Sequence, residues 1–127
     1  MSTTTQFLRQ FKKGNFMCCN VCTQCYNTGT VTVKDDRKTY FVAKKTTTST
    51  ALQHLLSAGA DYEGGNNLRV EFQVDTHAAL DVAAFSNAIL DKKGEVVGHV
   101  YSFCLEDSFD ADYNDFYVNI VAWDKKG

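Results

Sequence analysis

The feature that most constrains the fold is a series of short segments rich in β-branched and aromatic residues, each bounded by turn residues. Residues 68–74, LRVEFQV, alternate strictly between apolar and polar side chains, which is typical of a strand with one buried face. Thr30–Val33 and Lys38–Ala43 flank the turn sequence KDDR and predict a β-hairpin. Further strands are predicted at Glu95–Leu105, after the turn sequence DKKG, and at Phe116–Trp123. Strands at this spacing predict an all-β sandwich or barrel.

Two segments have the local character of helices instead. Residues 50–60, TALQHLLSAGA, carry apolar side chains at helical spacing, and residues 77–85, HAALDVAAF, are rich in alanine. By propensity both segments are predicted to be helical. An α+β fold therefore stays open on local pattern, although packing in small all-β domains overrides such propensity.

The composition is that of one ordinary folded domain. The 127 residues are 44% hydrophobic and 22% charged, which is enough for one core, and no linker or repeat divides residues 1–127. A net charge of −2 and a pI near 5.8 do not suit a nucleic-acid-binding surface. No apolar run approaches the roughly 20 residues of a membrane span, and the first residues lack the apolar stretch of a secretory signal. We expect a soluble protein that is cytoplasmic as synthesised, with no nucleic-acid partner and no membrane insertion; non-classical export to the cell surface is the alternative.

Residues 106–115, EDSFDADYND, concentrate five carboxylates in one segment that contains no basic residue. Carboxylate and amide oxygens are the ligands of hard cations such as calcium, which takes six to eight oxygens at roughly 2.3–2.6 Å. The alternating spacing of Asp110, Asp112 and Asn114 would turn successive oxygens toward a common centre. One divalent cation would leave the five carboxylates at −3, whereas two would leave them at −1. Because close carboxylates repel one another, the charge favours a pair of neighbouring cations.

The acidic segment begins like an EF-hand loop but does not continue as one. Asp115 stands where an EF-hand requires glycine, and Val121 stands where it requires glutamate. An EF-hand also needs flanking helices, whereas both flanks here are predicted strands. The EF-hand is therefore excluded, and a solvated acidic turn remains the simplest alternative to a metal site.

The acidic segment, the β-branched strand that follows it, Trp123 and the C-terminal glycine together resemble the LecB-type calcium-dependent fucose- and mannose-binding bacterial lectins. In that family a loop reading E-D-G-x-D-x-D-Y-N-D precedes the last strand, and Ser108 replaces its glycine here. The resemblance is tight over these ten residues and loose over the rest of the chain. It implies a small antiparallel β-sandwich of Greek-key-like order, in one domain over residues 1–127. It also implies two adjacent calcium ions (Ca2+) per site, both coordinated by the sugar.

The resemblance further implies which residues form the site. The calcium ligands would be Glu106, Asp110, Asp112, Asn114, Asp115, Asn27 and, from a neighbouring subunit, the terminal carboxylate of Gly127. The sugar would contact Asp107, Asp110, Asp112, Asn114, Asp115 and Thr28. Asp112 and Asp115 would serve both ions, and Asn20 is the alternative to Asn27 as the ligand from the early part of the chain. Gly127 stands two residues further from Asp115 than in the family, so the tail either bulges or loses this contact.

The function implied by the resemblance is carbohydrate binding. Two vicinal sugar hydroxyls would replace water on calcium and donate hydrogen bonds to carboxylates that already bind the metal. This chemistry needs no nucleophile or proton transfer, so we expect no enzyme activity. The partner would be a mono- or oligosaccharide or a glycoconjugate, of fucose or mannose type. A homodimer or homotetramer would make weak single sites multivalent.

Two further functions stay open. The first is a calcium-stabilised β-sandwich with a structural or adhesion role and no sugar binding. The second is a metal or redox module built on the cysteine cluster, whose members are Cys18, Cys19, Cys22 and Cys25, with Cys104 elsewhere. The C-x2-C-x2-C spacing also occurs in iron–sulfur proteins. On an extended strand, however, residues three apart face opposite sides, so these thiols gather only if the segment loops.

The remaining chemistry-bearing residues carry no site signal. His54, His77 and His99 have no partnering spacing and are expected at the surface or in the core. Trp123 lies on an apolar strand and is expected to pack in the core.

Overall fold

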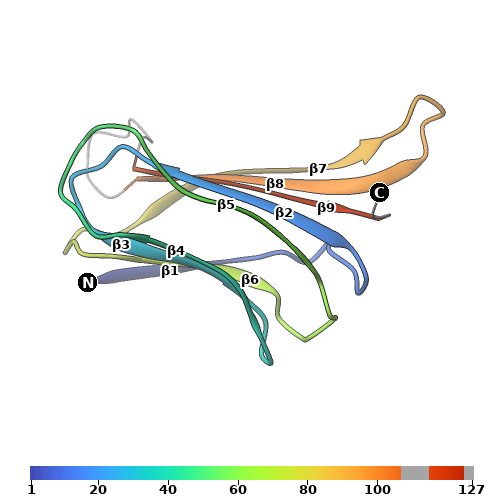
Figure 1. Ribbon diagram of the computed structural model, residues 1–127, viewed down its shortest axis with the longest axis horizontal. Coiled ribbons are helices and arrows are strands. Elements are labelled where there is room, and N and C mark those ends of the chain that lie inside the picture. Colours follow the sequence, from blue (N-terminus) through green and yellow to red (C-terminus); the bar gives the residue numbers. More distant parts are fainter. Residues whose placement is uncertain (107–114, 125–127) are drawn as a thin grey trace.

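The computed structural model describes residues 1–106 and 115–124, which form two antiparallel β-sheets packed face to face (Figure 1). The strands of this part are β1 (Ser2–Phe7), β2 (Phe16–Thr23), β3 (Gly29–Lys34), β4 (Thr39–Lys45), β5 (Gln53–Asp61), β6 (Arg69–Val74), β7 (Asp81–Leu90), β8 (Val96–Glu106) and β9 (Phe116–Trp123). One sheet has the order β1-β6-β3-β4, and the other has the order β5-β2-β9-β8-β7. The predicted all-β sandwich is therefore confirmed. No helix that could cross a membrane occurs within the described ranges.

The core lies between the two sheets and follows the alternation of the strands. Val70, Phe72 and Val74 of β6 are buried from one side, and every second residue of β9 from Phe116 is buried from the other. The rings of Phe72 and Phe103 meet across the gap, edge to face, with centroids 6.4 Å apart. This burial of apolar side chains is the main favourable term that holds the sheets together.

The helical prediction for residues 50–60 is wrong, because most of this segment forms β5. β5 pairs with β2, and the register shifts between Val21 and Cys22: Val21 lies opposite Leu56, whereas Cys22 lies opposite His54. Leu55 is therefore the extra residue of a β-bulge. The two consecutive leucines at the bulge interrupt the alternation of a strand and imitate helical spacing.

The helical prediction for residues 77–85 is also wrong. Asp81–Leu90 forms β7, which pairs with β8 along its whole length at the edge of the five-stranded sheet. Most of its side chains are exposed, so the small alanines show no inward-facing pattern. Backbone pairing with β8 outweighs the few tenths of a kcal/mol per residue by which alanine favours a helix.

Trp123 does not pack in the core. Because Phe116, Val118, Ile120 and Ala122 face inward, Trp123 faces outward, where 36% of its surface is exposed. Its ring covers Gly98 of the neighbouring strand: a Cβ on Gly98 would lie 3.1 Å from the Trp123 ring. The expectation was wrong because β9 carries apolar residues on both of its faces.

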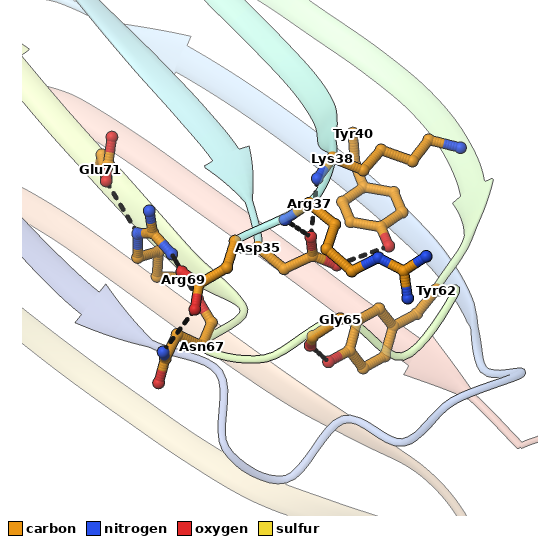
Figure 2. A network of polar contacts seen from close by, with 10 residues as sticks. Asp35, Arg37, Lys38, Tyr40, Tyr62, Gly65, Asn67, Arg69 and Glu71 are labelled. Carbon is orange, nitrogen blue, oxygen red and sulfur yellow. Dashed lines mark hydrogen bonds and ion pairs between the residues drawn. The ribbon is translucent and has the colours of Figure 1, made fainter.

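The β3–β4 turn lies at the end of the sandwich opposite the start of β9 (Figure 1). A buried carboxylate, that of Asp35, holds this turn (Figure 2). Asp35 accepts hydrogen bonds from the backbone nitrogens of Arg37 (2.7 Å) and Lys38 (2.8 Å) and from the Tyr40 hydroxyl (2.9 Å). Burial raises the pKa of Asp35, but these hydrogen bonds and one from the Gly65 backbone outweigh it, so the net pKa lies below its ordinary value. The network joins the hairpin turn to the connection between β5 and β6.

Candidate functional site

Glu106 and Asp115 lie at the two ends of the acidic segment, side by side on the β8–β9 hairpin. Glu106 is the last residue of β8, and Asp115 directly precedes β9. The Asp115 backbone nitrogen donates a 3.2 Å hydrogen bond to the Leu105 carbonyl, which closes the hairpin at this point. Both carboxylates are buried, with 1% and 5% of the residue surface exposed. Antiparallel pairing therefore brings together two acidic residues that are nine positions apart.

The end of β2 supports Asp115 from the other side. The Thr23 hydroxyl donates a hydrogen bond to the Asp115 carbonyl oxygen, and the Gln24 backbone nitrogen donates to the same oxygen at 3.3 Å. The Tyr117 hydroxyl donates to the Gln24 side-chain oxygen at 3.0 Å. These contacts fix the backbone of Asp115 relative to the β2–β3 connection.

Asn27 and Thr28 lie in that same connection and are half-buried. The Asn27 carbonyl accepts a hydrogen bond from the Cys25 thiol at 3.3 Å, and the Thr28 carbonyl accepts one from the Asp75 backbone nitrogen at 2.9 Å. Gly29 follows them, and its backbone lies close to both β6 and β9. A Cβ at this position would lie 2.7 Å from the Gln73 carbonyl oxygen and 3.1 Å from the Phe116 ring. The Asn27 connection is therefore held at the same end of the sandwich as Asp115.

Lys45 ties β4 to this connection. Its ammonium group donates hydrogen bonds to the Tyr26 carbonyl (3.4 Å) and to the Thr47 carbonyl, while only 2% of the residue is exposed. Sequence reasoning missed Lys45 and Thr23, because a lysine or threonine at a strand end carries no local signal of burial. Counting the alternation along β4 and β2 would have placed both on the inner faces.

Asn20 lies elsewhere. It occupies the middle of β2, opposite Asn119 of β9 and Ser57 of β5, and its side chain is exposed on the outer face. Of the two asparagines considered as ligands, Asn27 is the one in the connection that contacts Asp115. Asp107, Asp110, Asp112, Asn114 and Gly127 lie outside the described residues.

The described residues of the site carry the oxygen groups that a hard cation prefers as ligands. Burying a carboxylate is costly unless partners compensate its charge, and a divalent cation is one such partner. Every candidate ligand, from Asn27 to Asp115, offers oxygen, which suits calcium rather than a soft transition metal. Within residues 1–106 and 115–124, no three His, Cys, Asp or Glu side chains gather closely enough to hold a metal.

The cysteines do not form a common cluster. β2 is a regular strand here, so Cys19 faces the core while Cys18 and Cys22 face outward, and Cys25 lies beyond the strand in the connection. Burial raises the pKa of the Cys19 thiol to about 12, which disfavours the thiolate that binds metals. The geometry of these residues, all of which are described, argues against a thiolate metal module.

The histidines are dispersed, as expected. His77 is exposed, and His99 packs half-buried against the ring of Tyr101 with centroids 5.2 Å apart. Burial lowers the pKa of His99. His54 contacts Cys22 on the outer face of the five-stranded sheet.

Three solved structures with the same architecture are bacterial lectins. The C-terminal domain of the BC2L-C lectin from Burkholderia cenocepacia superposes with a TM-score of 0.63 at 23% identity, covering 97% of this chain and 96% of that one. A high-affinity mannose-binding lectin of Ralstonia solanacearum gives 0.61 at 18% identity, covering 92% and 94%. Chromobacterium violaceum lectin CV2L, solved in complex with alpha-methyl-fucoside, gives 0.61 at 18% identity, covering 97% and 96%. The chain has the fold of these lectins.

This likeness confirms, at the level of the fold, the resemblance to LecB-type lectins that the acidic segment indicated. It extends over nearly the whole of both chains, whereas the sequence resemblance was tight over ten residues. No protein-family model matches the chain, and no curated protein matches it in sequence. The lectin fold is therefore shared at low sequence identity.

Proposed function

We propose that this protein is a lectin that binds a sugar through two adjacent calcium ions at the acidic segment. The observation that carries the proposal is the burial of two acidic residues, Glu106 and Asp115, which lie directly beyond the last β8–β9 pair, Leu105 and Phe116. The backbone of Asp115 is hydrogen-bonded to the β2–β3 connection that contains Asn27. Three bacterial lectins share the fold, and the names of two of them record mannose and a fucoside as ligands.

The residues of the proposed site divide into two groups. Calcium would be held by oxygen ligands from three parts of the chain. These are Asn27, the acidic-segment residues Glu106, Asp110, Asp112, Asn114 and Asp115, and the terminal residue Gly127. Asp107 and Thr28 would contact only the sugar, whereas Asp110, Asp112, Asn114 and Asp115 would contact both the sugar and calcium. Bound calcium would supply open coordination positions for sugar hydroxyls. The chain's own part is to keep the carboxylates close together and to accept hydrogen bonds from those hydroxyls. No covalent bond is made or broken, so the proposed activity is binding and not catalysis.

The preference for a fucose- or mannose-type sugar is part of the proposal and rests on the lectins that share the fold. We also propose that the chain self-associates into a homodimer or homotetramer. Single lectin sites bind weakly, and several sites in one assembly raise the overall affinity for a multivalent glycan. The outer face of the five-stranded sheet supports it: Phe85 and Trp123 are both large, apolar and exposed there. Size-exclusion chromatography with light scattering would measure the mass of the assembly against the 14.2 kDa chain.

A glycan array probed with and without calcium tests the function. We expect binding to fucose- or mannose-containing glycans in calcium and none after EDTA. Glu106→Gln should abolish binding, whereas the matched control Glu95→Gln, in the exposed turn before β8, should leave it unchanged. Binding that survives both EDTA and Glu106→Gln would refute the proposed site.

The glycan array, together with melting curves recorded in calcium and in EDTA, decides between the lectin and a calcium-stabilised structural or adhesion domain. If calcium raises the melting temperature of the wild-type chain but no glycan is bound, the structural alternative replaces the lectin. The specific observation in its favour is that the buried carboxylates sit at the junction of two core strands, where a cation would also stabilise the fold.

A further inference from the structure

Cys22 and His54 face each other across the β2–β5 pair, outside the proposed sugar site. They are direct partners in the antiparallel register, and the Cys22 sulfur lies 3.2 Å from the His54 Nδ1 atom. This distance allows a hydrogen bond between thiol and imidazole. β5 is the edge strand of its sheet, so the pair lies at a margin of the sandwich.

The β-bulge at Leu55 is what brings the two side chains together. Had the pairing of Val21 with Leu56 continued without a shift, Cys22 would lie opposite Leu55, and His54 would lie opposite Thr23, which faces the core. The extra residue turns His54 to the outer face beside Cys22. Bulges commonly re-aim a side chain in this way, and they are enriched next to functional groups.

The pair opens into a surface hollow of about 430 Å³, lined by Asn20, Cys22, His54, Leu55, Leu56 and Ser57. This volume is within the range of small-molecule sites, roughly 300–1,000 Å³. A small reagent can therefore reach the sulfur without any opening of the sheet.

Three of the other four thiols, Cys18, Cys19 and Cys25, have a different environment. Cys19 is buried in the core, and Cys25 is buried with its thiol donating to the Asn27 carbonyl. Cys18 shares the strand, the outer face and the half-buried class of Cys22, yet no imidazole contacts its sulfur within the described residues. Cys18 is therefore the matched internal control for Cys22.

We propose that Cys22 is a reactive thiol, with His54 as its base, that forms a mixed disulfide with low-molecular-weight disulfides of the glutathione type. His54 Nδ1 accepts the proton of the Cys22 thiol, because the thiolate is the attacking form. The Cys22 sulfur then attacks one sulfur of the reagent and forms a new S–S bond, while the S–S bond of the reagent breaks. The other half of the reagent leaves as a thiolate and takes up the proton. One thiol and one disulfide thus give one mixed disulfide and one thiol, and no other oxidant is needed.

The test is the rate at which each cysteine of the reduced, folded chain reacts with glutathione disulfide, followed by acid quenching and peptide mass spectrometry. We expect Cys22 to react at least about tenfold faster than Cys18, and His54→Asn to remove most of that difference. His54→Asn should keep the melting temperature, and free imidazole should restore part of the Cys22 rate in His54→Ala, which a purely structural role of His54 would not allow.

Equal rates at Cys22 and Cys18, or a Cys22 rate unchanged in His54→Asn, would overturn the proposal. If the His54 variants do not fold, Cys22→Ser provides the second measurement: it should remove the fastest-reacting site and leave only slow modification. Fast modification that persists in Cys22→Ser would equally refute the assignment. The inference is independent of the proposed function, because neither calcium nor sugar enters the measurement.

Discussion

The Thr23 hydroxyl donates a hydrogen bond to the Asp115 carbonyl oxygen, which joins the end of β2 to the residue directly before β9. Thr23 and Asp115 are 92 positions apart, and both are buried. This contact makes the backbone of a proposed calcium ligand depend on a distant strand. The site is therefore built by the packing of the sandwich as well as by the acidic segment.

Replacing Thr23 with valine keeps the shape of the side chain but removes the donor. We expect a loss of about 1–2 kcal/mol in the free energy of unfolding, together with weaker calcium binding, because the buried Asp115 carbonyl loses a partner. Urea unfolding in EDTA measures the first effect, and calorimetry measures the second. Thr32→Val, at a half-buried outward position of β3, is the matched control and should be nearly neutral in both. Equal behaviour of the two variants would show that the hydroxyl of Thr23 has no special role.

Lys45→Met should destabilise the connection that carries Asn27. Methionine preserves the long aliphatic side chain but leaves the carbonyls of Tyr26 and Thr47 without the ammonium donor. We expect a loss of about 1–3 kcal/mol in the free energy of unfolding and a lower sugar affinity. The neighbouring Lys44 is exposed, so Lys44→Met should change neither quantity. A Lys45→Met variant as stable as Lys44→Met would contradict the account of this contact.

The lowered pKa of Asp35 predicts that the free energy of unfolding decreases as the pH falls. Its pKa is lower in the folded chain than its ordinary value of 3.8, so the unfolded state takes up a proton first as the pH falls. The stabilisation by Asp35 is fully present at pH values above the pKa of Asp35 in the unfolded chain. It is lost as the pH falls through the lower pKa of Asp35 in the folded chain. Asp35→Asn should lower stability at pH 7 and flatten the decline below about pH 5.

Chemical denaturation of both chains across pH 2.5 to about pH 7 measures this difference. Asp36 also has a lowered pKa, caused mainly by hydrogen bonds from Asn67 and Arg69, while the charge of Asp35 opposes this lowering. Asp35→Asn therefore lowers the pKa of Asp36 further, and this change acts against the flattening expected from the loss of Asp35 itself. Parallel curves for the two chains would mean that the Asp35 network does not favour the charged carboxylate.

The fold could be predicted where each strand has one polar and one apolar face. β6 and the β3–β4 hairpin show this alternation in their residues, and both lie where they were expected. β5 could not be recognised because the bulge at Leu55 breaks its period, and β7 could not because an exposed edge strand has no buried face to reveal. β1, with three threonines in a polar segment, was not anticipated, although threonine favours strands.

The candidate site could be predicted only in part, for a related physical reason. The acidic residues are contiguous, so their shared chemistry is visible in the sequence as a single segment. Thr23 and Lys45 take part through contacts between segments that are far apart in the chain, and such contacts depend on which face of a strand each residue occupies. Trp123 shows the same limit, because hydrophobicity alone does not say which face of β9 meets the core.

The central claim is that two calcium ions at the acidic segment hold the sugar, and counting those ions tests it most directly. Metal-free chain in an excess of methyl-α-fucoside or methyl-α-mannoside would be titrated with calcium by calorimetry. The account predicts two calcium ions bound per chain in the wild type. It also predicts loss of both calcium and sugar binding in Asp112→Ala, since this carboxylate would serve both ions. A stoichiometry of one or none, or sugar binding retained in Asp112→Ala, would contradict it.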